Sequence, residues 1–70
     1  MIFFNLHEIL KKENMSQNKF SKISGVRPNT INNICNNNLK RFELATLEKI
    51  MAVLFPMGYK IEDVITYKDR

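Results

Sequence analysis

The stretch Ser16–Arg41 reads SQNKFSKISGVRPNTINNICNNNLKR, and it decides the fold of the chain. Gly25, near its middle, can adopt the left-handed backbone conformation that ends a helix. Only two residues separate this glycine from Pro28, which is well placed at the first position of a helix because its missing N–H group costs nothing there. The stretch therefore predicts two short helices, over residues 17–24 and 28–36, joined by a tight turn.

A second pattern predicts three further helices outside this stretch. At each expected helix start an apolar residue precedes the N-cap, and another follows five positions after the first, as in a hydrophobic staple. Asn5 and Ser16 are good N-cap residues, and Glu8 lies three positions after Asn5 as in a capping box. The other three starts have poorer caps, at Arg27, Glu43 and Lys60. We expect five helices, over residues 6–13, 17–24, 28–36, 44–55 and 61–66.

The apolar side chains follow the helical period, so that each helix can turn one face toward a common core. The expected core residues are Leu6, Ile9, Leu10, Phe20, Ile23, Ile31, Ile34, Leu44, Leu47, Met51, Leu54, Ile61, Val64 and Ile65. Residues 1–4 and 65–67 are instead rich in β-forming residues and could pair as two strands, within one chain or between two. The expected fold class is all-α and compact, with five helices and room for a short terminal β pairing.

Composition limits the classes of protein to which the chain can belong. Its 70 residues suffice for one domain, which we expect to span residues 1–70. The single Cys35 cannot form an internal disulfide, and we expect it to be buried and inert. We expect no enzyme, because the chain has one histidine, one cysteine and no nucleophile–base spacing. No catalytic residue, metal, cofactor, small-molecule ligand or membrane association is expected, and an intracellular location follows.

Charge is distributed unevenly along the chain. Between residues 14 and 42 there are five basic residues and no acidic one, whereas residues 43–70 carry four basic and five acidic residues. Such a one-sided field is what a phosphate-binding face needs, although a solvated basic surface would show the same distribution.

The second helix of the turn has an unusual polar face. At about 100° per residue, its four asparagines fall on one side and its two isoleucines on the other. These asparagines are Asn29, Asn32, Asn33 and Asn36. Asparagine is a middling-to-poor helix former, but its amide offers the donor and acceptor that match adenine in the major groove of DNA. The alternative is a solvated face without a function.

These features together resemble the Cro and lambda-repressor-like helix-turn-helix proteins. The resemblance lies in Ser16-Gln17, Phe20-Ser21, Gly25-Val26 and Ile31 at their spacing, in the Asn36-Asn37 corner, and in Lys40-Arg41-Phe42. Residues 2–6 and 46–50 also look like the small stand-alone branch of that family. Two positions depart from the family pattern: Arg27 stands where Ser or Thr is usual, and Asn37 where Gly is common. The link between the last two helices, residues 55–60, is also longer than usual.

The resemblance implies a five-helix lambda-repressor-like domain whose helix 28–36 enters the major groove. The expected base contacts are Pro28, Asn29, Asn32 and Asn33, with Asn29 and Asn33 as the leading readers. The expected phosphate contacts are Ser16, Gln17, Arg27, Asn36, Lys40 and Arg41.

The expected function is that of a sequence-specific regulator of transcription, a repressor, bound to a double-stranded operator that contains A·T pairs. We expect a homodimer, with the terminal strands or residues 55–59 as the interface, in the cytoplasm and at the nucleoid of a bacterium or its phage. The alternative is a protein-interaction module that keeps the fold without specific DNA binding.

Overall fold

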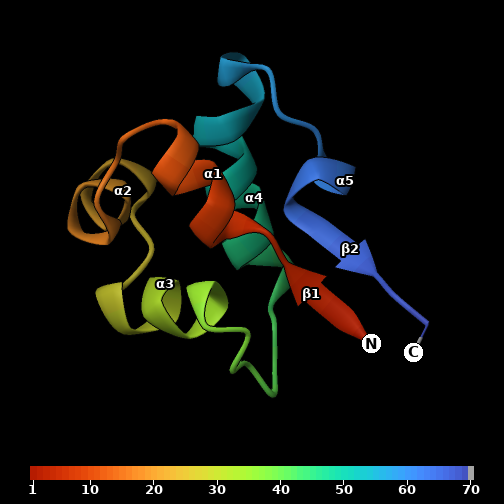
Figure 1. The fold of residues 1–70 in the computed structure, drawn as a ribbon. Coiled ribbons are helices and arrows are strands. Elements are labelled where there is room, and N and C mark those ends of the chain that lie inside the picture. Colours follow the sequence, from red (N-terminus) through yellow and green to blue (C-terminus); the bar gives the residue numbers. More distant parts are fainter. Residues whose placement is uncertain (70) are drawn as a thin grey trace.

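The computed structural model describes residues 1–69. Its helices lie where the sequence predicts them, and each helix end is within two residues of its expected position. Helix α5 stops earlier than expected because Ile65 begins a strand. The elements in chain order (Figure 1) are β1 (Ile2–Phe4), α1 (Leu6–Lys12), α2 (Gln17–Ser24), α3 (Pro28–Cys35), α4 (Leu44–Leu54), the 3-10 turn η1 (Phe55–Met57), α5 (Ile61–Val64) and β2 (Ile65–Tyr67).

The two terminal strands pair with each other within the chain. They are antiparallel, with Phe3 opposite Thr66. The Asn5 N–H group donates to the Val64 carbonyl at 2.7 Å, and the Lys68 N–H group donates to the Met1 carbonyl at 2.8 Å. The first and last strands therefore lie side by side, and β2 continues directly from α5 (Figure 1).

The core lies between all five helices. Seven side chains from these helices are fully buried: Leu6, Phe20, Ile31, Ile34, Ile50, Leu54 and Val64. Complete burial of one such side chain stabilises the fold by roughly 1.5–3 kcal/mol before chain entropy is subtracted. Ile50 was not among the expected core residues, yet it and Leu54 are the buried residues of α4.

Three expected core residues are exposed instead. Leu44 is 71% exposed, Ile61 is 52% exposed and Ile23 is 50% exposed. Leu44 and Ile61 are the first residues of their helices, and their side chains lie outside the part of each helix that packs on the core. Ile23 lies on the outer flank of α2, because Phe20 and Ser21 take the inward positions of that helix.

The helix ends agree with the predicted caps in part. The Ser16 hydroxyl accepts the Lys19 N–H group at 3.0 Å, and Gly25 ends α2 with a φ of 79°. The capping box expected at Asn5 is wrong. The Asn5 side chain donates to the Thr66 hydroxyl at 2.7 Å, since β2 lies close enough to offer a partner across the chain. At α5 the Lys60 N–H group donates to the Asp63 carboxylate at 2.8 Å, which makes this start better capped than expected.

Candidate nucleic-acid interface

The turn between α2 and α3 is held by side chains as well as by the glycine. The buried Ser21 hydroxyl donates to the Val26 carbonyl at 2.5 Å. The Val26 N–H group in turn donates to the Ser24 hydroxyl at 3.2 Å. Val26 is itself buried, so the turn is fixed against the core and sets the angle at which α3 leaves α2.

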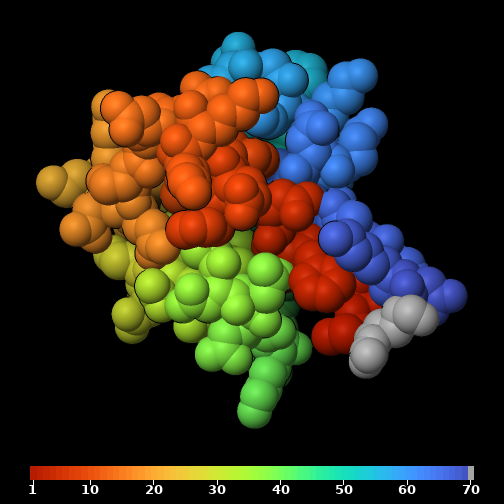
Figure 2. All heavy atoms as spheres, viewed as in Figure 1, coloured from red at the N-terminus to blue at the C-terminus, as the bar shows by residue number. Residues whose placement is uncertain are grey.

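Helix α3 has one buried and one exposed face. Ile31, Ile34 and Cys35 are buried against the other helices. On the opposite side, Pro28, Asn29, Asn32 and Asn36 are exposed and Asn33 is half-buried. The sequence-predicted face is therefore present, and α3 lies at one edge of the molecule with that face accessible (Figures 1 and 2).

A chain of side-chain amides crosses this exposed face. Nδ2 of Asn32 donates to Oε1 of Gln17 at 3.3 Å, and Nδ2 of Asn36 donates to Oδ1 of Asn32 at 3.2 Å. Within residues 1–69, the side chains of Asn29 and Asn33 make no hydrogen bond, so both amides are available to a ligand. Asn32 retains one donor hydrogen and one lone pair, because an amide offers two of each.

The expected phosphate-contacting residues lie at both ends of α3, in the segment that follows it and at the start of α2. Arg27 is exposed at the start of the helix, and Lys40 and Arg41 are exposed in the segment that follows it. That segment projects from the body of the molecule (green in Figure 2). Ser16 and Gln17 lie at the start of α2, where the Ser16 oxygen is already engaged with the Lys19 N–H group. Its hydroxyl hydrogen remains free to be donated.

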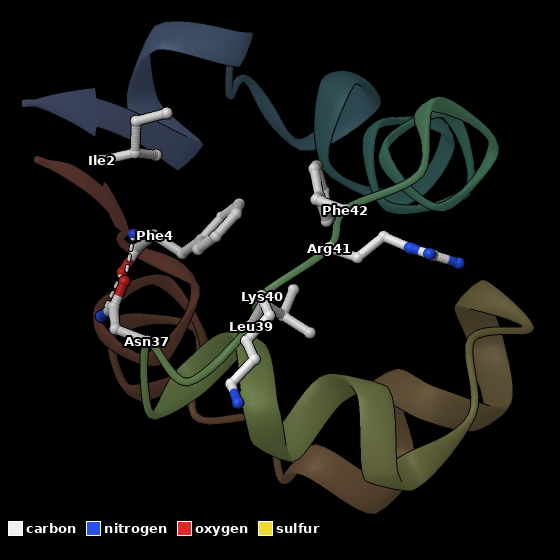
Figure 3. A pocket seen from close by; sticks show the side chains of 7 residues that line it. All are labelled: Ile2, Phe4, Asn37, Leu39, Lys40, Arg41 and Phe42. Carbon is white, nitrogen blue, oxygen red and sulfur yellow. Dashed lines mark hydrogen bonds between the residues drawn. The ribbon is translucent and has the colours of Figure 1, made fainter.

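The segment after α3 is attached to strand β1, which the sequence did not predict. The Phe4 N–H group donates to Oδ1 of Asn37 at 2.5 Å, and Nδ2 of Asn37 donates to the Phe4 carbonyl at 3.2 Å. The Phe4 and Phe42 rings lie 4.8 Å apart at 59°. Ile2, Leu39 and these two rings line an apolar hollow of about 200 Å³ (Figure 3). One signal was available, namely an asparagine where the resembled family commonly has glycine.

A second, polar hollow of about 370 Å³ separates the turn from the start of α4. Arg27 and Thr30 line it on one side, and Glu43, Thr46 and Lys49 on the other. Lys49 adds a cation near Arg27 that the sequence did not single out, whereas Glu43 adds an acidic group to the border of this otherwise basic region.

Two other residues with reactive or titratable groups, Cys35 and Tyr59, pack against the body of the domain. Burial raises the pKa of the Cys35 thiol, which favours the protonated and less nucleophilic form. The pKa of the Tyr59 hydroxyl is raised, mainly by its 2.5 Å hydrogen bond to the Glu13 carboxylate and to a smaller extent by burial. Residues 1–69 contain no cluster of three or more His, Cys, Asp or Glu side chains that could hold a metal ion. No helix in the same range is both long and apolar enough to cross a membrane.

Comparison with known proteins agrees with this geometry. No curated protein and no solved structure matches the chain. The family model of the Cro/C1-type helix-turn-helix DNA-binding domain, however, matches residues 5–70, nearly the whole chain. The match covers the two helices and the turn described above, together with the remaining core helices. The chain belongs to the Cro/C1-type helix-turn-helix DNA-binding domain family.

Proposed function

We propose that this chain is a sequence-specific transcriptional regulator, a repressor, that places α3 in the major groove of a double-stranded operator. The observation that carries the proposal is the exposed asparagine face of α3, with cations before and after it and no acid between residues 14 and 42. A repressor of this kind acts by occupying its site. The whole chain serves as one DNA-binding domain.

The proposed base readers are Asn29 and Asn33, assisted by Asn32 and Pro28. The side chains of Asn29 and Asn33 make no hydrogen bond within residues 1–69, so no protein contact has to break before they meet a base. An asparagine amide can donate to adenine N7 and accept from adenine N6 at the same time, which favours operators with A·T pairs. Pro28 offers apolar contact to a thymine methyl group.

The proposed phosphate contacts are Ser16, Gln17, Arg27, Asn36, Lys40 and Arg41. Phosphate contacts set the position of a protein on the duplex and carry no base information themselves. Lys40 and Arg41 supply the charge at one end of α3 and Arg27 at the other. The Gln17–Asn32–Asn36 chain of hydrogen bonds joins these contacts to the reading face.

The proposed active form is a homodimer, which would place two copies of α3 about 34 Å apart on one side of the duplex. The terminal strands already pair within the chain, so the surface around η1 is the better interface. Phe55 is 68% exposed there, and it shares a largely apolar hollow of about 340 Å³ with Met51 and Ile61. Lys60 and Glu62 border the same hollow, and a two-fold axis can bring the cation of one copy to the anion of the other.

Selection from a random duplex library tests the proposal. The winning duplex and a scrambled duplex are then titrated at two salt concentrations. The proposal predicts an enriched inverted repeat that contains A·T pairs and is bound far more tightly than the scramble. Equal, strongly salt-dependent binding to both duplexes would mean a non-specific binder. Absence of binding to either would favour an interaction module with the same fold.

A further inference from the structure

Residues 37–42, here called the phosphate loop, contact the same residue of β1, Phe4, at their first and last positions. At the start of the loop, the Asn37 side chain exchanges two hydrogen bonds with the Phe4 backbone. At its end, the Phe42 ring packs on the Phe4 ring at 4.8 Å. Lys40 and Arg41 lie between these two anchors, and Figure 3 shows their side chains extending outward from the loop. The position of both cations therefore depends on Phe4.

The Phe4 backbone is free to bind Asn37 because of the register of the sheet. The Asn5 backbone hydrogen-bonds to Val64, immediately before β2, and the Met1 backbone hydrogen-bonds to Lys68, immediately after it. In an antiparallel pair such residues alternate with residues whose N–H and carbonyl groups point away from the partner strand. Phe4 is one of the latter, opposite Ile65. The Asn37 amide supplies the acceptor and donor that a third strand would otherwise supply at this point.

The backbone at Asn37 does not explain why this residue is an asparagine. Its φ is 55°, and α3 ends there in a Schellman motif in which the Asn38 N–H group donates to the Asn33 carbonyl at 2.8 Å. Glycine adopts that conformation more readily than asparagine does. Unlike a glycine, the Asn37 side chain adds two hydrogen bonds to the backbone of Phe4, 33 positions away in the chain.

Asn14 provides an internal comparison. It has a φ of 54° and ends α1 in the same motif, in which the Met15 N–H group donates to the Leu10 carbonyl at 2.8 Å. Within residues 1–69 its side chain makes no hydrogen bond. The two asparagines thus share a backbone role, and only Asn37 has the additional attachment to Phe4.

We propose that Asn37 is a positioning residue for DNA recognition. By attaching the phosphate loop to Phe4, it fixes Lys40 and Arg41 relative to the last turn of α3, which carries Asn33. This inference rests on the proposed function. Fixed phosphate contacts hold the reading face in register with the bases, whereas non-specific binding depends on the number of charges alone. Loss of the attachment should therefore weaken binding to the selected operator and leave binding to other DNA unchanged.

The test compares Asn37→Gly with the matched control Asn14→Gly. Both variants keep a residue suited to positive φ, and only the first loses the attachment. Circular dichroism first establishes that each variant is folded at 25 °C. At that temperature the Kd for a scrambled duplex is then divided by the Kd for the selected duplex. We expect Asn37→Gly to lower this ratio about tenfold, equivalent to about 1.4 kcal/mol, through weaker binding to the selected duplex. Asn14→Gly should leave it unchanged.

Hydrogen exchange of the Phe4 amide gives a readout without DNA. In Asn37→Gly this N–H group loses its acceptor on the open side of β1, so its exchange should accelerate, whereas Asn14→Gly should not affect it. Should Asn37→Gly fail to fold, Phe42→Leu loosens the other end of the loop and should lower the same ratio.

Three results would count against the inference, and each has a different meaning. An unchanged Kd ratio with accelerated Phe4 exchange would show that the attachment exists but does not position the loop. Unchanged exchange in Asn37→Gly would show that the attachment does not form. A wild-type protein that does not distinguish the two duplexes would overturn the proposed function, and this inference with it.

Discussion

Replacement of Ser21 by alanine should destabilise the turn between α2 and α3 more than its small change in volume suggests. The Ser21 hydroxyl is buried and donates to the Val26 carbonyl at 2.5 Å. In Ser21→Ala that carbonyl loses its donor in a site where water cannot replace it easily. A buried acceptor left without a partner costs about 1–3 kcal/mol, and the better helix propensity of alanine offsets up to about 0.7 kcal/mol of this. The expected loss in the free energy of unfolding is thus about 1–2 kcal/mol.

Thermal unfolding followed by circular dichroism measures this loss. In a domain of this size each kcal/mol changes Tm by roughly 4–8 °C, so Ser21→Ala should lower Tm by about 5–15 °C. Ser24→Ala is the matched control, because it makes the same change in the same helix. There the hydroxyl only accepts the Val26 N–H group at 3.2 Å in a partly buried position, so the fall in Tm should be less than half as large. An unchanged Tm for Ser21→Ala, or a larger fall for Ser24→Ala, would refute this explanation of the turn.

Three further predictions concern the proposed interface and the buried thiol. Asn33→Ala should weaken binding to the selected operator by about 1–3 kcal/mol and relax the preference at one or two base pairs; an unchanged preference in a repeated selection would exclude Asn33 as a reader. Lys40→Gln should weaken binding to all duplexes and reduce the slope of log K against log salt by about 1, whereas Lys12→Gln, outside the acid-free stretch, should change neither. Because burial raises the pKa of Cys35, its alkylation by iodoacetamide at pH 8 should be much slower in the folded protein than in urea, and equal rates would show that the thiol is accessible.

The features that the sequence predicted well are those determined by neighbouring residues. Gly25 and Pro28 define the end of one helix and the start of the next through their own backbone preferences, which act within a few residues. The Ser16 cap is similarly local and is confirmed by its bond to the Lys19 N–H group. The two faces of α3 follow from the helical period alone, and burial of Ile31 and Ile34 confirms them.

The features that the sequence did not predict depend on distant parts of the chain. The Asn5 side chain has Thr66 as a partner, 61 positions away, and so it does not cap its own helix. Leu44 fits the apolar period of α4, but packing ends before the first turn of that helix and leaves it exposed. The Asn37–Phe4 attachment requires the register of the terminal strands to be known, and no pattern near either residue specifies that register.

The most direct test of the central claim is a nuclear magnetic resonance titration of the protein with the selected operator duplex. If α3 reads the bases, the side-chain amide signals of Asn29 and Asn33 should shift most, together with the backbone signals of Lys40 and Arg41. Signals of residues on the surfaces of α1 and α4 that face away from α3 should not shift. Shifts confined to the surface around Phe55 and Ile61, with the asparagine signals unchanged, would contradict the claim and would mean that this fold recognises its partner with another face.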